Sequence, residues 1–106
     1  LEAYYEQFKK PIIMFEFGAE AIEGMHSLPS VAFSEEYQTD FLREYCRIFD
    51  ELPYVQGELV WNFADFMTKQ GTIRVNGNRK GVFTRERQPK SAAFYLKERW
   101  QNKTEK

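Results

Sequence analysis

Cysteine and histidine are almost absent from this chain of 106 residues, which contains only Cys46 and His26. A single thiol cannot form a disulfide framework within the chain, and it cannot supply the several thiolates of a structural zinc site. Long apolar runs are also missing, since no stretch approaches the roughly 18 residues of a membrane-spanning helix. We therefore expect a globular chain with no membrane partner and no bound metal ion, in a reducing compartment such as the cytoplasm.

Charge is distributed unevenly along the chain, although the net charge is only −1. Residues 1–68 carry 13 acidic and 4 basic side chains, whereas residues 69–106 carry 3 acidic and 11 basic ones. A basic segment can indicate nucleic-acid binding, but these charges are spread over a predicted loop and helix. The phosphate-binding pattern GxxxxGK[ST] is absent as well. We expect neither a nucleic-acid partner nor a cofactor.

The hydrophobic pattern predicts two strands that alternate with helices. Residues 11–18 (PIIMFEFG) form an apolar run opened by proline and closed by glycine, which is typical of a strand buried on both faces. Residues 55–63 (VQGELVWNF) form a second mostly apolar strand. Helices are predicted over residues 1–10, 34–52 and 91–100. This alternation indicates βαβ units and a parallel α/β sheet.

The predicted helix at 34–52 begins at Ser34, a residue type that commonly caps helix N-termini. Cys46 lies beside its apolar stripe and is expected to be a buried thiol. The stripe itself comprises Tyr37, Phe41, Tyr45, Ile48 and Leu52. Two strands cannot form a stable parallel sheet alone, because both faces and both edges need cover. We therefore expect the chain to be part of a larger domain.

Glu16 is the first candidate catalytic residue. It interrupts the apolar run of the first strand two positions before Gly18, at the carboxyl end of that strand. A carboxylate buried there is costly unless it is paired or hydrogen-bonded, and in α/β enzymes the carboxyl ends of the strands form the active face. The alternative is that Glu16 ends the strand early and forms a salt bridge to a neighbouring strand.

The connection over residues 64–89 is too long for an ordinary loop, since loops beyond about 12–15 residues are usually functional or disordered. Its Asn76-Gly77 pair, flanked by short β-compatible runs, predicts a hairpin. Asn78 and Lys80 would then point to one side and Arg79 away into solvent. An amide beside an ammonium suits a bound carboxylate or phosphate. The alternative is a solvated hairpin with a charged surface.

Trp61 and His26 are weaker candidates. Trp61 closes the second strand, where an aromatic ring can stack on a sugar, but its position alone favours core packing. His26 lies in a predicted loop without a second histidine or a nearby acid pattern, so we expect no metal or triad role for it.

Several runs of the chain resemble segments of the family 2 glycoside hydrolases. Residues 13–18 (IMFEFG) resemble the strand that carries the family's nucleophile. Residues 60–66 (VWNFADF), 78–85 (NRKGVFTR) and 88–94 (QPKSAAF) are similar to those members that act on glucuronides. The resemblance covers essentially the whole chain in one order, and the Asn-x-Lys pair separates these members from the family's β-galactosidases.

The fold implied by this resemblance is the (β/α)8 TIM barrel, of which the chain would hold only the last βα units. A complete barrel needs roughly 250 residues. Residues 1–106 would accordingly be the C-terminal portion of the catalytic domain. Residues 11–17 would form strand seven, residues 55–63 strand eight, and residues 91–100 the last helix.

The resemblance also implies a role for each candidate residue that matches the family's motifs. Glu16 would be the catalytic nucleophile, and Asn78 and Lys80 would hold the carboxylate of the substrate. Trp61 would line the sugar site, and Arg74 would be a supporting substrate contact. The implied reaction is the retaining hydrolysis of β-D-glucuronides through a covalent glycosyl-enzyme intermediate, so the expected partner is a small-molecule β-glucuronide.

A second catalytic residue is expected outside the chain. In the family the acid/base glutamate follows an asparagine, and no Asn-Glu pair occurs here. We therefore expect that residue upstream of Leu1, and we expect the 106 residues alone to be inactive. The resemblance further implies a homotetramer for the full-length enzyme.

Two other functions remain open at the level of the sequence. One is a family 2 hydrolase of neutral sugars, similar to the β-galactosidases. The other is a non-catalytic module that binds carbohydrate or protein. The first alternative differs from glucuronide hydrolysis in the charge of its substrate. The second differs from it in having no turnover.

Overall fold

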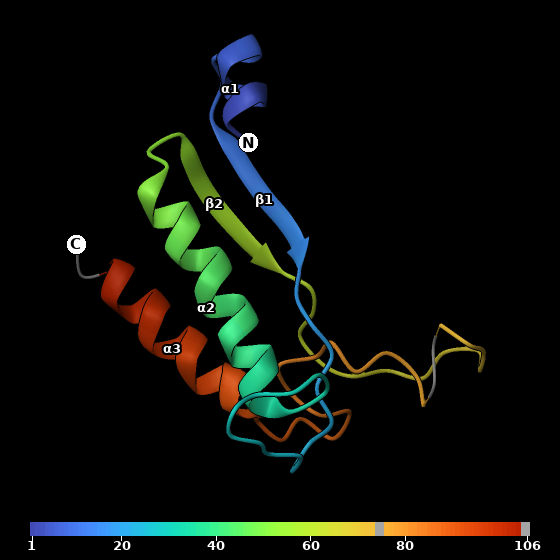
Figure 1. The fold of residues 1–106 in the computed structure, drawn as a ribbon. Coiled ribbons are helices and arrows are strands. Elements are labelled where there is room, and N and C mark those ends of the chain that lie inside the picture. The colour runs from blue at the N-terminus through green and yellow to red at the C-terminus, as the bar shows by residue number, and fades with distance from the viewer. Residues whose placement is uncertain (74–75, 105–106) are drawn as a thin grey trace.

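The structure is a computed structural model that describes residues 1–73 and 76–104. Its elements follow the predicted alternation of helices and strands (Figure 1). In chain order they are α1 (Glu2–Phe8), β1 (Ile12–Phe17), α2 (Glu35–Glu51), β2 (Val55–Val60) and α3 (Ser91–Thr104). No helix within the described ranges is long and apolar enough to cross a membrane.

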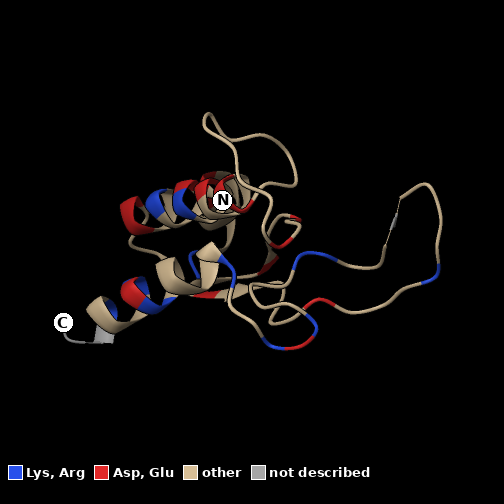
Figure 2. Cartoon of the chain, turned by 90° about the horizontal axis from the view of Figure 1, so that it is seen from below, with Lys and Arg blue, Asp and Glu red and all other residues tan. Residues whose placement is uncertain are grey.

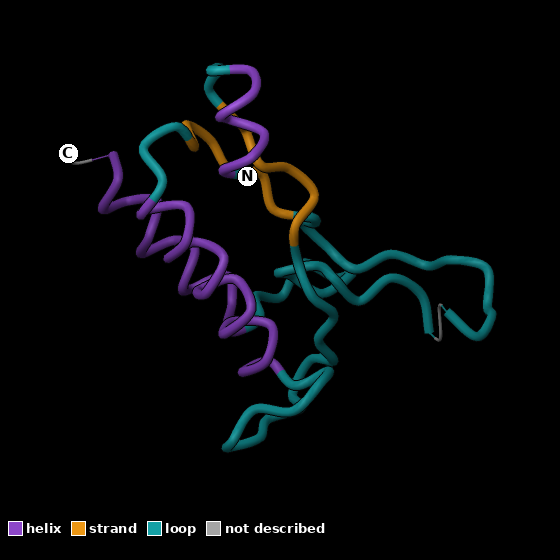
Figure 3. Tube along the Cα trace, turned by 45° about the horizontal axis from the view of Figure 1, so that its top comes forward, coloured by secondary structure: helices purple, strands orange, loops and turns teal. Residues whose placement is uncertain are grey.

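The two strands form a parallel sheet, as the sequence predicts, and α2 and α3 run side by side over one of its faces (Figures 1 and 3). The core between the layers contains Phe17 of β1, Leu42 of α2 and Leu96 of α3. Each such buried apolar side chain stabilises the fold by roughly 1.5–3 kcal/mol. The connection between β2 and α3 extends away from the carboxyl ends of the strands as a long arm (Figure 2).

A β-bulge interrupts the pairing of β1 with β2 near the end of β1. Phe15 pairs with Leu59 and Phe17 pairs with Val60, so Glu16 is the extra residue of the bulge. The extra residue explains why Met14 and Phe17, three positions apart, both contact the core. The strand β2 ends at Val60, which is earlier than the predicted boundary at residue 63.

The expectation that β1 is buried on both faces is wrong for the described residues. Ile13 and Phe15 are 60% and 63% exposed, and Leu59 on the neighbouring strand is 60% exposed. The reason is that α2 and α3 cover a single face of the sheet, and no described segment covers the opposite one. An apolar sheet face therefore lies open.

Helix α2 begins where the sequence predicts, since the Ser34 hydroxyl accepts a hydrogen bond from the backbone N–H of Tyr37 at 3.1 Å. Cys46 is buried, as expected. The predicted stripe is wrong for Tyr37, Tyr45 and Ile48, which are each more than a third exposed, whereas Phe41 packs against the core as expected. The side that α2 buries comprises Glu35, Gln38, Thr39, Leu42, Cys46 and Phe49. Three of these residues are polar, so hydrophobicity alone does not reveal this face.

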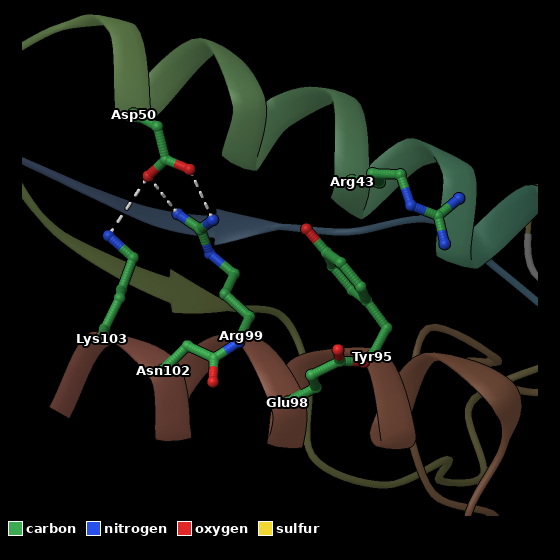
Figure 4. A pocket seen from close by; sticks show the side chains of 7 residues that line it. All are labelled: Arg43, Asp50, Tyr95, Glu98, Arg99, Asn102 and Lys103. Atoms are coloured by element: carbon green, nitrogen blue, oxygen red, sulfur yellow. Dashed lines mark hydrogen bonds and ion pairs between the residues drawn. The ribbon is translucent and has the colours of Figure 1, made fainter. Parts of the chain in front are cut away.

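Arg99 of α3 links this helix to β2 and to α2 through its guanidinium group. It donates to Glu58 of β2 at 2.7 and 3.0 Å and to Asp50 of α2 at 2.8 Å through two nitrogens. The Asp50 carboxylate binds both Arg99 and Lys103 (Figure 4). These residues line a groove of about 830 Å³ between α2 and α3. The hydrogen bonds from Arg99 lower the pKa of Asp50 from its ordinary value of 3.8 to about 2.

Acid is expected to weaken this link between α2 and α3. Because the pKa of Asp50 is lowered on folding, its stabilising effect is complete above about pH 4 and is lost as the pH falls toward about 2. Urea unfolding followed by circular dichroism is expected to give a lower free energy of unfolding at about pH 3 than at about pH 6. In the variant Arg99→Met the same acidification is expected to cost less, and an unchanged acid loss would contradict the assignment.

Candidate active site

The candidate residues gather where the carboxyl ends of β1 and β2 meet residues 78–83 of the connection between β2 and α3. The backbone N–H of Trp61 donates to the carbonyl of Phe17 at 2.9 Å, which joins the two strand ends. The N–H of Asn62 donates to the carbonyl of Lys80 at 3.2 Å, which joins the second strand end to residues 78–83. Glu16, Trp61 and Lys80 therefore belong to three neighbouring backbone segments on one end of the sheet.

Glu16 is exposed and lies in the left-handed backbone region, with a φ of 62°. A side chain costs roughly 1–2 kcal/mol in this conformation, so the bulge turns the residue out of the strand's regular alternation at some expense. In the described part of the chain its carboxylate has no hydrogen bond and no ion pair. The alternative role as a salt bridge to a neighbouring strand thus finds no partner among the described residues.

Gly18 explains how the two strand ends come so close together. A Cβ atom at this position would overlap the carbonyl oxygen of Trp61, so only glycine allows the approach. The Trp61 ring is 38% exposed and meets Phe66 edge to face, with 6.3 Å between ring centroids. Trp61 is therefore not a member of the core cluster, and its ring borders the strand ends.

The predicted hairpin lies only partly within the described residues, because residues 74 and 75 of its first arm fall outside them. Asn76 and Gly77 have the positive φ values of an Asn-Gly turn, 61° and 84°. Most described backbone partners of residues 78–83 lie in residues 62–66, where Asn78 and Phe66 exchange two hydrogen bonds, and the N–H groups of Ala21 and Lys90 donate to the same segment. Gly81 permits this pairing, since a Cβ there would overlap the backbone of Ala64 and Asp65.

Asn78 and Lys80 are connected, but their side chains border different hollows. Asn78 is buried, and its Oδ1 accepts a hydrogen bond from the backbone N–H of Lys80 at 2.8 Å. Lys80 is half-buried beside Phe33 and Tyr37, and its Nζ has no ion pair among the described residues. Asn78 instead lines a hollow with Glu23, Asp65 and Arg85, among others.

Strand alternation predicts that Arg79 points away into solvent, and this prediction is wrong. Its guanidinium folds back to Glu23 at 3.3 Å and to Asp65 at 3.6 Å, and its side chain is only 28% exposed. Two acids on other segments attract it, which strand alternation does not anticipate. Arg74, the predicted supporting contact, lies outside the described residues.

A buried ion pair between Lys90 and Asp65 lies beneath this end of the sheet. Lys90 is 1% exposed, and its Nζ donates to Asp65 Oδ1 at 2.9 Å. The same ammonium donates to the carbonyls of Ala21 at 2.8 Å and Arg79 at 3.2 Å. Asp65 Oδ1 also accepts the backbone N–H of Gly81 at 3.0 Å. Sequence reasoning missed this pair, because a lysine next to a helix start is ordinarily solvated.

Glu35 joins the starts of the two long helices. Its carboxylate accepts the backbone N–H of Gly24 at 2.7 Å and the N–H of Ser91, the first residue of α3, at 2.6 Å. Burial raises the pKa of Glu35, but these hydrogen bonds outweigh it and leave the pKa below its ordinary value. The carboxylate thereby fixes α3 against α2.

His26 has acidic neighbours that the sequence did not suggest. Its Nδ1 lies 2.6 Å from Glu36 Oε2, and this hydrogen bond raises the pKa of the imidazole. Within the described ranges, no group of three or more histidine, cysteine, aspartate or glutamate side chains could hold a metal ion. His26 lies in the loop that precedes α2, beside Glu35 and Glu36 at the start of that helix.

Comparison with known proteins places this geometry in a family. Residues 1–104 match the family described as "Glycosyl hydrolases family 2, TIM barrel domain". The curated β-glucuronidase of Paenibacillus borealis is 58% identical over 100 residues, which cover 94% of this chain and 17% of that protein. The β-glucuronidase of Rattus norvegicus is 56% identical over 101 residues, covering 93% of this chain and 16% of that protein.

Solved structures agree with the sequence comparison. A β-D-glucuronidase structure from Dictyoglomus thermophilum superimposes with a TM-score of 0.91 at 56% identity, covering 94% of this chain and 17% of that one. A Ruminococcus gnavus β-glucuronidase in complex with D-glucuronic acid gives a TM-score of 0.87 at 51% identity, covering 92% and 17%.

The chain thus spans about a sixth of the length of the relatives that it matches. Two parallel strands with helices along one face fit part of a TIM barrel. Because the family match extends over residues 1–104, the chain belongs to glycosyl hydrolases family 2 and matches its TIM barrel domain.

Proposed function

We propose that this chain supplies the nucleophile and the carboxylate-binding segment of a retaining β-glucuronidase. The observation that carries the proposal is the unpaired, exposed carboxylate of Glu16, on a bulge at the same strand ends as Trp61 and Lys80. Its relatives at more than 50% identity are β-glucuronidases, one of which was solved with D-glucuronic acid. In this proposal β1 and β2 are barrel strands seven and eight, and α3 is the last helix.

The reaction proceeds in two steps that use two carboxyl groups about 5–5.5 Å apart. In the first step Glu16 attacks the anomeric carbon, while an acid/base glutamate protonates the departing glycosidic oxygen. In the second step that glutamate takes a proton from water, and the water oxygen displaces Glu16 from the anomeric carbon. Since the chain has no Asn-Glu pair, the acid/base residue is not among its 106 residues, and the chain alone should show no turnover.

A glucuronide brings its own negative charge to a site whose nucleophile must be ionised. Two like charges about 6 Å apart repel by roughly 3 kcal/mol at an effective dielectric constant near 20. Lys80 can offset this repulsion, because its ammonium has no ion pair among the described residues. Asn78 uses Oδ1 to hold the Lys80 backbone, which leaves its NH2 group as a donor for the sugar carboxylate.

Two further contacts complete the proposed sugar site. The exposed part of the Trp61 ring can stack on the apolar face of the sugar, and Arg74 is assigned a supporting contact from the family resemblance. The cytoplasmic location and the homotetramer stay predictions, as does the absence of nucleic-acid and membrane partners.

Replacing Glu16 with glutamine is expected to abolish turnover while substrate binding persists, because the amide is a poor nucleophile of nearly equal size. The test uses a chimaera in which residues 1–104 replace the matching segment of the Dictyoglomus thermophilum enzyme. A chromogenic β-glucuronide measures activity. An inactive but folded parent chimaera, or near-normal rates in Glu16→Gln, would overturn the proposal.

Replacing Lys80 with alanine is expected to reduce kcat/KM on a β-glucuronide by about 100-fold, if an interaction of roughly 3 kcal/mol is lost. The loss on the matching β-galactoside is expected to be within about threefold, because a neutral sugar gains little from the ammonium. Lys97→Ala removes the same charge from an exposed position on α3 and serves as the control. Equal losses on both substrates would contradict the role of Lys80 and favour a neutral-sugar hydrolase.

A further inference from the structure

We propose that Gln38 of α2 is a positioning residue that holds Lys80 in register with the strand that carries Glu16. This inference rests on the proposed function and concerns the recognition of the sugar carboxylate. Gln38 does not touch the reacting atoms, and it acts through the backbone of the residues that do.

The side-chain amide of Gln38 bridges the two segments that carry the proposed site residues. It is 1% exposed, and its Nε2 lies 3.1 Å from the carbonyl oxygen of Ala19, three residues after Glu16. The same nitrogen lies 3.0 Å from the carbonyl of Gly81 and 3.4 Å from that of Lys80. All three partners are acceptors, so the NH2 group must be the end that faces them.

These contacts satisfy carbonyl groups that otherwise have no donor. Within the described residues, Gln38 is the only donor to the carbonyls of Ala19 and Gly81. The carbonyl of Lys80 is shared with the N–H of Asn62. Loss of the amide would therefore leave the carbonyls of Ala19 and Gly81 without a donor, while the Lys80 backbone keeps its hydrogen bonds to Asn78 and Asn62.

The choice of glutamine at this position is not explained by packing. Its Oε1 is buried and has no hydrogen-bond partner in the described structure, which is unfavourable for the fold. A methionine has nearly the same length and shape without this cost. A residue that served packing alone would not need an amide, whereas a residue that must hold three carbonyl groups does.

A second set of hydrogen bonds between the two segments explains why the fold should survive without Gln38. Lys90 holds the same two segments through the carbonyls of Ala21 and Arg79. In the described structure the hydrogen bonds that Lys90 donates go to Ala21, Asp65, Arg79 and Val82 and not to Lys80 or Gly81, whereas Asp65 accepts the N–H of Gly81. In a Gln38 variant the segments remain attached by Lys90 and by the backbone hydrogen bond from Ala21 to Arg79, and the loss is confined to the carbonyl contacts next to the Lys80 side chain.

The variant Gln38→Met in the chimaeric enzyme tests this inference. Its kcat/KM on a β-glucuronide is expected to fall about tenfold, mostly through KM, because the ammonium is displaced from the sugar carboxylate. Its thermal unfolding midpoint is expected to stay near that of the parent. Gln7→Met, on an exposed position of α1, is the matched control and should behave as the parent does.

A double-mutant cycle separates positioning from a purely structural role. If Gln38 acts through Lys80, Gln38→Met should cause little further loss, less than about twofold, in a Lys80→Ala background. Equal losses in both backgrounds, or parental glucuronide kinetics in Gln38→Met, would overturn the inference. Should Gln38→Met fail to fold, Gln38→Asn keeps the amide but shortens its reach, and it carries the same expectations.

The proposed function can fail separately from this inference. Full activity in Glu16→Gln removes the function itself, whatever Gln38→Met does. Loss of activity in Glu16→Gln together with parental behaviour of Gln38→Met removes only the positioning role.

Discussion

The buried ion pair between Lys90 and Asp65 is the interaction on which the active end of the chain depends. One ammonium group joins Ala21 in the loop after β1 to Asp65 and Arg79, which lie in the connection between β2 and α3. Removing one partner of such a pair typically costs about 3–5 kcal/mol, because the other charge stays buried without compensation. This polar junction fixes the relative positions of the three segments, together with the ring contact between Phe63 and Phe83.

The scaffold charges and the site charges behave differently. Arg99, Glu35 and Lys90 each satisfy several partners and thereby lock layers or segments together. Glu16 and Lys80 have no ion pair in the described part of the chain. A charge that is already neutralised by the protein has little left for a ligand. The paired charged groups thus make the scaffold rigid, and the charges of Glu16 and Lys80 can interact with a ligand.

Local sequence signals predicted the order of elements well, but not the polar contacts between them. Ser34 marks the start of α2, and the apolar run with Glu16 marks β1 and its carboxyl end. The buried side of α2 was missed, since Gln38 is polar and its partners lie on segments 19–43 residues away in sequence. Lys90 and Arg79 were missed for the same reason. Such contacts depend on tertiary approach, which no local pattern encodes.

The uncovered sheet face has a practical consequence for anyone who handles this chain by itself. Ile13, Phe15 and Leu59 form a contiguous apolar surface on strands that each have only one paired edge in the described structure. Exposed strand edges beside an apolar face readily recruit other chains. In isolation the polypeptide should accordingly be prone to aggregate, and its solubility will depend on a protein surface that shields these side chains.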